Sequence, residues 1–323
     1  MLSLLPVLGL SFGPTDLPIV VFVMARILLT ALAILLTGPA IVLSLPLLAG
    51  RLLAVAVLLQ VALSICAFYG LYIEPFNLKV TELKLPAAQF YPERPLRILQ
   101  ISDLHVEYTS PREREVIERV TQLQPDLIVL TGDYLNLDYT TDPETIAQAR
   151  LVLEQLHAPL GVYAVKGSVP VDTPEVMRQL FAGTSIRVLD GETQRIRLPL
   201  GDLYLLGVPV APGDAGTLKQ LAAGLSQGGY KVLLYHTPDL IETASALGID
   251  LYLAGHTHGG QIRLPFYGAV FTSSRYGKRY ESGEYRVGET LLYVSRGVGM
   301  EGGHMPRIRF LAPPELVLVE CGR

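Results

Sequence analysis

The first part of the chain is dominated by two long runs of apolar residues. Residues 27–50 and 52–73 contain no charged side chain, and only Arg51 separates them. Each run exceeds the roughly 20 residues that a helix needs to cross the hydrocarbon core of a bilayer. Residues 1–75 are therefore predicted to form a transmembrane anchor.

The number of spans in this anchor stays open. Gly38, Pro39 and Pro46 interrupt the first run, and proline disfavours a continuous helix. A second interpretation places one helix over 17–37 and another over 52–73, with Arg51 in a hairpin between them. The anchor is thus predicted to contain two or three helices, and the alternative is a buried helical hairpin in a soluble protein.

The predicted location is the cell membrane, as a multi-pass protein. A cleavable signal peptide is disfavoured, because no basic segment precedes the apolar stretch and that stretch continues too far. Arg26 and Arg51 are the only basic residues of the anchor, so the positive-inside rule does not decide on which side the rest of the chain lies.

The pattern changes after Pro75. Residues 77–85 alternate apolar and polar positions, which predicts a strand, and a proline-punctuated linker follows up to residue 95. Residues 76–95 are therefore a leading strand and linker, and 96–323 form one folded domain.

Short apolar strands and helices alternate along this domain. Strands are predicted at 96–102, 126–131, 161–166, 231–235 and 250–254, with further short strands across 186–209. Helices are predicted at 112–124, 142–157 (with Asp142 as its N-cap), 174–181, 215–226 and 238–247. The glycine- and tyrosine-rich tail, 261–320, is typical of hairpins. This order predicts an α/β fold with a mixed sheet.

Composition excludes several classes of protein. Half of the residues are apolar and 17% are charged, which excludes disorder for most of the chain. Cys66 and Cys321 are the only cysteines, so the chain is not a disulfide scaffold. A pI near 5.9 gives no basic footprint, and we expect no nucleic-acid partner.

Carboxylate and imidazole side chains follow several of the predicted strands. They are Asp103 and His105, Asp133, His236, and His256 with His258. Loops at the carboxyl ends of strands in an open α/β sheet meet in one crevice, so we expect these side chains to converge. The chain has six histidines, and four of them lie at strand ends. Turn residues and structural histidines are the alternative interpretation of each position taken singly.

This ligand chemistry indicates a metal site. Imidazole and carboxylate without thiolate suit Mn, Fe or Zn. Four ligands would complete one tetrahedral zinc, whereas six indicate two ions that share a carboxylate. Two ions about 3.5–4 Å apart clamp a phosphoryl group and lower the pKa of a bound water.

The ordered set D-x-H, G-D, H and G-H-x-H resembles the calcineurin-like metallophosphoesterase superfamily. Gly255–Gln261 (GHTHGGQ) resembles the membrane-anchored bacterial branch, and the likeness covers about 96–320. The resemblance implies two stacked mixed sheets flanked by helices, with two divalent ions as cofactors. It implies that Asp103, His105 and His258 hold the first ion, that Asp133 bridges, and that His236 and His256 hold the second.

One motif departs from the family pattern. Where the family has G-N-H-[DE] after the third strand, this chain has Gly167-Ser168-Val169-Pro170. By the resemblance, Ser168 replaces a ligand of the second ion with a weaker hydroxyl, and Val169 replaces the histidine that protonates the leaving group. A missing general acid costs roughly 10²–10⁴ in rate. Asp172 and His304 are the candidate substitutes, and the alternative for Asp172 is a helix cap before Pro174.

The resemblance implies a membrane-anchored, metal-dependent phosphoesterase that uses a metal-activated hydroxide. Its expected substrate is a phosphodiester, diphosphate or phosphomonoester, with a lipid-linked substrate favoured by the anchor. The branch includes hydrolases of nucleotide-linked acylated sugars. The competing hypothesis, prompted by the departed motif, is a degenerate member with reduced or no catalysis that acts as a metal-binding or interaction module. Simple recognition of a protein partner is a third.

Overall fold

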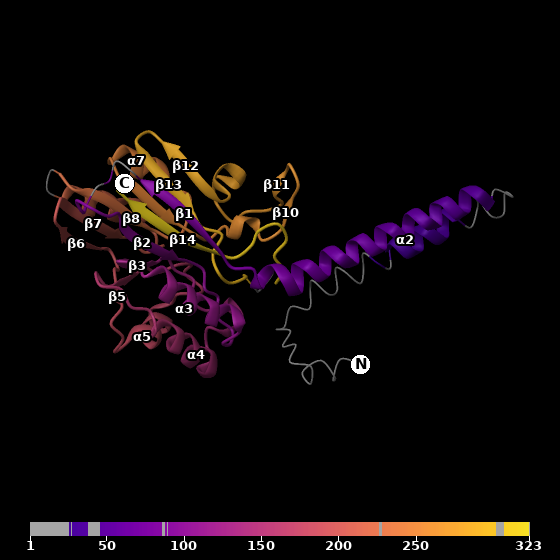
Figure 1. Cartoon of the computed structure of the whole chain (residues 1–323), viewed down its shortest axis with the longest axis horizontal. Helices are drawn as coiled ribbons and strands as arrows, with labels where there is room; N and C mark the ends of the chain where they lie inside the picture. Colours follow the sequence, from indigo (N-terminus) through magenta and orange to yellow (C-terminus); the bar gives the residue numbers. More distant parts are fainter. Residues whose placement is uncertain are drawn as a thin grey trace.

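The computed structural model describes residues 26, 28–37, 46–85, 88, 90–225, 228–301 and 307–322. Figure 1 shows a layered domain from which one long helix projects. This helix is α2 (Pro46–Phe68), and it continues through η3 (Tyr69–Ile73) and η4 (Glu74–Phe76) into the domain.

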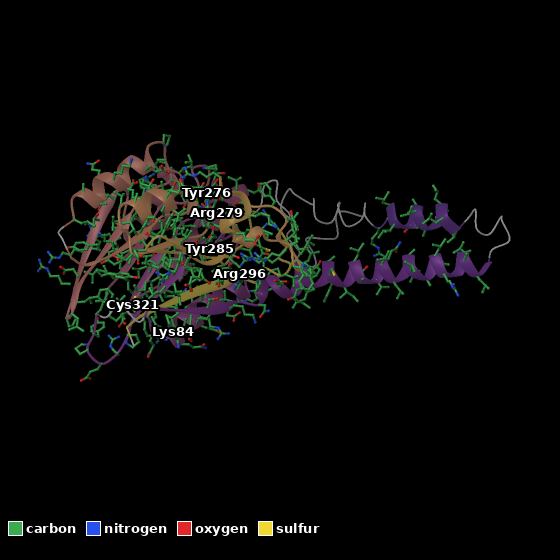
Figure 2. The ribbon with its side chains drawn as sticks, turned by 90° about the horizontal axis from the view of Figure 1, so that it is seen from above. Lys84, Tyr276, Arg279, Tyr285, Arg296 and Cys321 are labelled. Atoms are coloured by element: carbon green, nitrogen blue, oxygen red, sulfur yellow. The ribbon has the colours of Figure 1, made fainter. Side chains whose placement is uncertain are left out.

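The described residues contain one helix that is long and apolar enough to cross a membrane. It spans Leu47–Phe76, its mean hydropathy is 2.4, and its most apolar window is not buried against the domain. The alternative of a buried hairpin in a soluble protein is therefore wrong. A shorter apolar helix, Leu28–Thr37, runs beside α2 (Figure 2), and the Gln60 side-chain amide donates to the Thr30 hydroxyl at 2.7 Å.

The structure corrects the predicted position of Arg51. The second interpretation placed this residue in a hairpin, but α2 begins at Pro46 and runs through Arg51, whose side chain is exposed. Proline fits the first turn of a helix, where its missing N–H is not needed, so Pro46 starts α2 and does not break it. Of the helix expected over 17–37, residues 28–37 are helical, and residues 17–25 and 27 lie outside the described residues.

The domain contains two six-stranded mixed sheets. The first has the order β1-β14-β2-β3-β4-β5, and the second has the order β12-β13-β9-β8-β7-β6. The strands of the first sheet are β1 (Lys79–Leu85), β2 (Leu96–Ile101), β3 (Leu127–Leu130), β4 (Val162–Ala164), β5 (Arg187–Val188) and β14 (Glu315–Cys321). Those of the second are β6 (Glu192–Leu198), β7 (Gly201–Gly207), β8 (Tyr230–Leu234), β9 (Leu251–Ala254), β12 (Gly283–Val287) and β13 (Thr290–Val294).

Apolar side chains of both sheets meet in a shared inner core. Leu96 and Leu127 of the first sheet belong to the same buried cluster as Leu205 and Leu253 of the second. A second cluster packs the outer face of the first sheet against helices α3 (Pro111–Leu123), α4 (Pro143–Leu153) and α5 (Pro174–Phe181). A third packs the second sheet against α6 (Asp214–Ala223) and α7 (Ile241–Ala246). The predicted architecture of two mixed sheets flanked by helices is confirmed (Figure 1).

Three helices begin as their sequences predict. Ser110, Asp142 and Thr173 each cap a helix whose first residue is proline, and each side chain accepts backbone N–H groups of the first turn. Side-chain caps satisfy donors that have no partner within the helix. The cap of α5 is thus Thr173, so the alternative role of Asp172 as that cap is wrong. Helix α4 ends at Leu153, well before the predicted end at His157.

The pairing of the C-terminal strand, β14, corrects the prediction for the tail. The tail was predicted to form hairpins, and β12–β13 is one, as is the small pair β10 (Arg263–Leu264) and β11 (Gly268–Ala269). However, β14 pairs in parallel with β1 and antiparallel with β2, in the other sheet. These pairings join residues more than 200 positions apart, which no local pattern reveals.

The sheet register places the foot of the long helix beside the carboxyl ends of the central strands. Lys79, the first residue of β1, pairs with Glu315 at the start of β14, and β14 runs antiparallel to β2. The start of β1 therefore lies at the same edge of the sheet as the end of β2. Since β1 follows η4, α2 joins the domain at this edge.

Candidate metal centre

The predicted ligands lie where the carboxyl ends of strands from both sheets meet. Asp103 and Asp133 follow β2 and β3 of the first sheet, whereas His236 and His256 follow β8 and β9 of the second. Gln100 ties the sheets together here, because its side-chain amide donates to the carbonyl of Ala254 at 2.9 Å. The site is thus formed between two stacked sheets, not along one.

One group of ligand atoms comes from Asp103, His105 and His258, all of them buried. His105 Nε2 lies 3.1 Å from His258 Nε2, and His258 Nε2 lies 3.6 Å from Asp103 Oδ1. The second group comes from Asp133, His236 and His256. His236 Nε2 lies 3.1 Å from both Asp133 Oδ2 and His256 Nδ1. All six predicted ligands are therefore brought together.

Asp133 lies between the two groups. Its Oδ2 atom, 3.1 Å from His236 Nε2, is also 3.8 Å from His105 Nε2 of the first group. A third group with atoms within 4.8 Å of one another joins His105, Asp133 and Glu301. The Glu301 carboxylate lies 3.7 Å from His105 Nε2. The position of Asp133 suits a bridging ligand, and Glu301 adds a seventh side chain.

The backbone at the ligands adopts an uncommon conformation. Nine described residues other than glycine have positive φ, and five of them are predicted ligands: Asp103, His105, Asp133, His256 and His258. Such conformations cost free energy and persist where the surrounding structure enforces them, often at functional sites. The repeated αL conformation explains how short loops after three strands, β2, β3 and β9, aim several side chains into one small volume.

Glycines allow the loops to approach the carboxylates closely. A Cβ atom on Gly255 would lie 2.2 Å from Asp103 Oδ2, and one on Gly167 would lie 2.2 Å from Asp133 Oδ1. A Cβ on Gly297 would lie 2.5 Å from Asp103 Cβ. No residue with a side chain fits at these three positions, so their glycines are required by the packing around the two carboxylates.

Ser168, from the segment 167–170 that departs from the family pattern, lies directly at the second group of ligand atoms. The Ser168 hydroxyl is 3.0 Å from Asp133 Oδ2 and 3.3 Å from His236 Nε2, and the Ser168 N–H donates to Asp133 Oδ1 at 2.6 Å. Val169 is 60% exposed and offers no titratable group. The hydroxyl thus occupies the position from which a weak ligand would act.

Asp172 and His304 were the candidate substitutes for the missing asparagine and histidine of the family. Asp172 is buried, and its carboxylate accepts the N–H groups of Asp133 at 2.8 Å, Gly167 at 2.7 Å and Tyr134 at 3.3 Å. It is not a member of any group of converging ligand atoms among the described residues. Asp172 therefore holds the loop that carries Asp133. His304 lies outside the described residues.

The buried carboxylates and histidines of the site shift one another's pKa values. Burial alone would lower the pKa of His236, but the Asp133 carboxylate outweighs it and raises that pKa to about 10. Burial likewise would raise the pKa of Asp133, and His236 reverses the direction, so this carboxyl stays ionised. Burial and the neighbouring His236 lower the pKa of His256 to about 4, and burial with His105 lowers that of His258 well below its usual 6.5. His256 and His258 are therefore neutral at neutral pH and have lone pairs to offer, whereas His236 carries a proton that a bound ion would displace.

The residues present fit divalent metal ions. Pairs of ring nitrogens face each other at 3.1 Å next to carboxylate oxygens, an arrangement that a cation between them stabilises. His236 Nδ1 lies 2.7 Å from the carbonyl oxygen of Thr131, which fixes the tautomer and directs Nε2 into the site. The donors are nitrogen and oxygen without thiolate, a set that suits Mn, Fe or Zn.

Two contributors were missed from the sequence. Glu301 follows no strand directly, and nothing in its spacing marked it. Arg309 is fully buried and donates to the carbonyl groups of Arg296 at 2.8 Å and Gly297 at 3.1 Å, which fixes the loop that packs against Asp103. A buried arginine is recognised only once its carbonyl partners are placed.

Comparison with known proteins agrees with this geometry. The sequence profile of the calcineurin-like phosphoesterases matches residues 96–170. The chain is 33% identical over 266 residues to the uncharacterized metallophosphoesterase YkuE of Bacillus subtilis, covering 77% of this chain and 87% of that protein. It is 31% identical to the phosphodiesterase YaeI of Escherichia coli, covering 70% and 82%.

A third relative is UDP-2,3-diacylglucosamine pyrophosphatase LpxG of Chlamydia trachomatis. The identity is 28% over 307 residues, covering 77% of this chain and 91% of that protein. The resemblance to this superfamily is thus confirmed by similarity over 77% of the chain. The chain belongs to the calcineurin-like metallophosphoesterases, a family of hydrolases that act on phosphate ester bonds.

Proposed function

We propose that this protein is a membrane-anchored, metal-dependent phosphoesterase whose substrate is a lipid-linked phosphodiester or diphosphate. The observation that carries the proposal is the convergence of six ligands at the sheet edge where α2 joins the domain. A site at this edge faces the end of the molecule that the apolar helix would hold at a bilayer. We further propose that Leu28–Thr37 belongs to a second crossing, since it lies beside α2.

We assign the ligands of two divalent ions as follows. Asp103, His105 and His258 hold the first ion, and His236 and His256 hold the second. Asp133 bridges, because its carboxylate lies between the two histidine groups. Glu301 supplements the ion next to His105, and the Ser168 hydroxyl is a weak ligand of the second ion. The second site is therefore the weaker of the two.

When bound, the two ions would neutralise the phosphoryl charge and lower the pKa of a water molecule between them. The protein's own contribution is to hold their ligands in place. The Thr131 carbonyl orients His236, and Asp172 fixes the loop that carries Asp133 through three backbone N–H groups. The Asp103 carboxylate accepts the N–H of His256 at 3.0 Å, which joins the two histidine groups.

The residues present favour substrates with a good leaving group. No titratable side chain occupies position 169, and all four histidines that the structure describes at the centre are assigned to metal. Without a general acid, esters of weakly basic leaving groups react far better than alkyl esters. Diphosphates meet this requirement, and the relative LpxG is named as a pyrophosphatase of UDP-2,3-diacylglucosamine, a diphosphate that carries acyl groups.

The second candidate function is a metal-binding or interaction module with reduced or no catalysis. The observation that favours it is the same replacement, because Ser168 offers a weaker ligand than asparagine and Val169 cannot donate a proton. The two functions differ in turnover, not in the ability to bind metal.

Two measurements on the full-length chain in detergent separate these candidates. Bound metal is counted by mass spectrometry after dialysis against Mn²⁺, and hydrolysis of bis(p-nitrophenyl) phosphate is followed in parallel. Metal-dependent turnover by the parent chain that exceeds the turnover of the Asp133→Asn variant supports the phosphoesterase function. Bound metal without turnover on this activated ester or on an acylated sugar diphosphate supports the module.

A further inference from the structure

A small hairpin beside the metal centre exposes an unusual concentration of apolar side chains. Its strands are β10 and β11, and every large apolar side chain between 264 and 271 is exposed: Leu264, Phe266, Tyr267, Val270 and Phe271. Elsewhere in the described part of 77–322, apart from Leu311 beside it, exposed large apolar side chains occur singly, at Tyr108, Leu151, Val169 and Leu200. Grouped exposure of this kind marks an interaction surface.

The tip of the hairpin projects a phenylalanine at a conformational cost. Phe266 has φ of 63°, in the left-handed region that a bulky side chain rarely adopts, and its side chain is fully exposed. Glycine or asparagine would suit this turn better. Among the residues that the structure describes, no neighbour covers Phe266, so packing between them does not explain its position, whereas a contact with another surface does.

The hairpin is joined to the domain end of the apolar helix. Backbone hydrogen bonds connect Arg263 to Phe310 at 2.8 Å and Arg309 to Gly70 of η3 at 3.0 Å. The Phe310 ring stands edge-on to Tyr69, with centroids 6.1 Å apart. Figure 1 shows β10 and β11 beside the point where α2 leaves the domain. The apolar tip therefore lies at the level where this helix would emerge from a bilayer.

The same hairpin forms one wall of the cleft at the metal centre. Phe271 and the residues that follow it, Thr272 and Ser273, line this cleft together with His256 and His258. A contact made by the hairpin tip would thus fix the distance and direction of the metal centre relative to whatever the tip touches.

We propose that the hairpin 262–272 inserts its apolar tip into the surface of the bilayer that α2 crosses, and so holds the metal cleft at the lipid headgroups. This inference rests on the membrane anchor of the proposed function, and it deepens that function by naming the bilayer as the surface that presents the substrate.

Continuity and residue type favour a bilayer over another protein. Tyr72, Ile73 and Phe76, at the end of the helix, are also exposed, so the apolar surface runs on from the helix to the hairpin. Lys278 lies 3.3 Å from the centroid of the Tyr267 ring. Aromatic rings with neighbouring lysine are typical of the headgroup region, where an apolar body and a polar end are both satisfied.

The absence of tryptophan from the sequence permits a direct test. Single-tryptophan variants of the full-length chain are reconstituted in phosphatidylcholine–phosphatidylglycerol nanodiscs, with and without brominated acyl chains that quench tryptophan. Phe266→Trp reports the hairpin, Leu58→Trp reports the middle of α2, and Leu200→Trp reports an exposed position at the β6–β7 turn, at the far end of the domain (Figure 1).

The inference predicts that brominated lipid removes about half or more of the emission of Phe266→Trp and Leu58→Trp, and leaves Leu200→Trp unchanged. Quenching of Leu58→Trp alone would overturn the hairpin contact while the membrane anchor stands. Quenching of neither variant would overturn the hairpin contact and the anchor together. A blue-shifted Phe266→Trp emission that brominated lipid does not quench would also overturn it, and would indicate a contact with a second copy of the chain.

Discussion

The hydroxyl oxygen of Ser168 lies 3.0 Å from Oδ2 of Asp133, the carboxylate between the two groups of predicted metal ligands. The same hydroxyl is 3.3 Å from His236 Nε2. The residue that departs from the family pattern is therefore not displaced from the centre. If Ser168 corresponds to the family asparagine, as the resemblance implies, its hydroxyl is a shorter and weaker ligand, so Ser168→Asn is an informative change.

We expect Ser168→Asn to tighten binding of the second ion. An amide oxygen reaches further than a hydroxyl, and side chains at metal sites typically change affinity by about 10–100-fold. Titration of the metal-free protein with Mn²⁺ by calorimetry measures this directly, with Ser168→Ala as the matched control that removes the hydroxyl. Equal weak-site affinities for all three proteins would show that position 168 does not contact the ion.

Val169→His is expected to act on the reaction and not on metal binding. An imidazole here would protonate the leaving group, a contribution of roughly 10²–10⁴ in rate for a strongly basic leaving group and little for an aryloxide. Because Val169 is 60% exposed, the change leaves the core packing intact. The rates on an alkyl and an aryl phosphodiester are compared. A similar change on both esters would contradict a role as proton donor.

Glu301→Gln is expected to weaken metal binding by about tenfold. The Glu301 carboxylate lies 3.7 Å from His105 Nε2, and an amide is a poorer ligand than a carboxylate. Glu289→Gln, at the exposed β12–β13 turn, is the matched control for loss of one negative charge. If both variants retain metal equally through dialysis against a chelator, Glu301 is not a ligand.

Stability is expected to depend on pH through Glu113. This carboxylate is buried, accepts the N–H of Ser110 and pairs with Arg112 at 2.8 Å. Burial would raise the Glu113 pKa, but Arg112 and the hydrogen bonds from Ser110 lower it below the usual 4.5. The stabilisation is therefore present above pH 4.5 and is lost as the pH falls through the folded pKa.

Thermal unfolding of Glu113→Gln tests this linkage. At pH 7 we expect a loss of about 1–3 kcal/mol, seen as a Tm several degrees lower, because the buried Arg112 loses its partner. The difference from the parent chain should shrink as the pH falls from 4.5 through the lowered pKa of the folded state, because Glu113 itself then becomes protonated. A difference that stays constant across this range would contradict the linkage. Glu118→Gln, at an exposed position of α3, is the control.

The ligands that could be predicted from sequence share one property. Asp103, Asp133, His236 and His256 each follow a short apolar strand, so the strand pattern alone brings them to one edge. The left-handed backbone at Asp103, Asp133 and His256 was not predictable, since it depends on how the two sheets pack. Glu301 was missed because its place beside His105 depends on residues distant in sequence, such as Gln261, whose side-chain oxygen accepts the Glu301 N–H at 2.6 Å.

The limits of the strand pattern are also visible in β14. The tail was predicted to form hairpins, but β14 pairs with β1 and β2, and its apolar residues are buried between the two sheets. In the anchor, hydropathy identified the long helix, whereas Arg51 misled because a charge near a helix end was taken as a boundary. The Arg51 side chain is exposed on α2, so its charge does not stop the helix.

The most direct test of the central claim is Mn²⁺-dependent hydrolysis of bis(p-nitrophenyl) phosphate by the full-length chain in detergent, with Asp133→Asn measured alongside. Asp133 is the carboxylate proposed to join the two metal sites. The account predicts turnover that requires Mn²⁺ and falls by about 10²-fold or more in the variant, which should keep the thermal stability of the parent. Turnover unchanged by Asp133→Asn or independent of added metal would contradict a two-metal phosphoesterase.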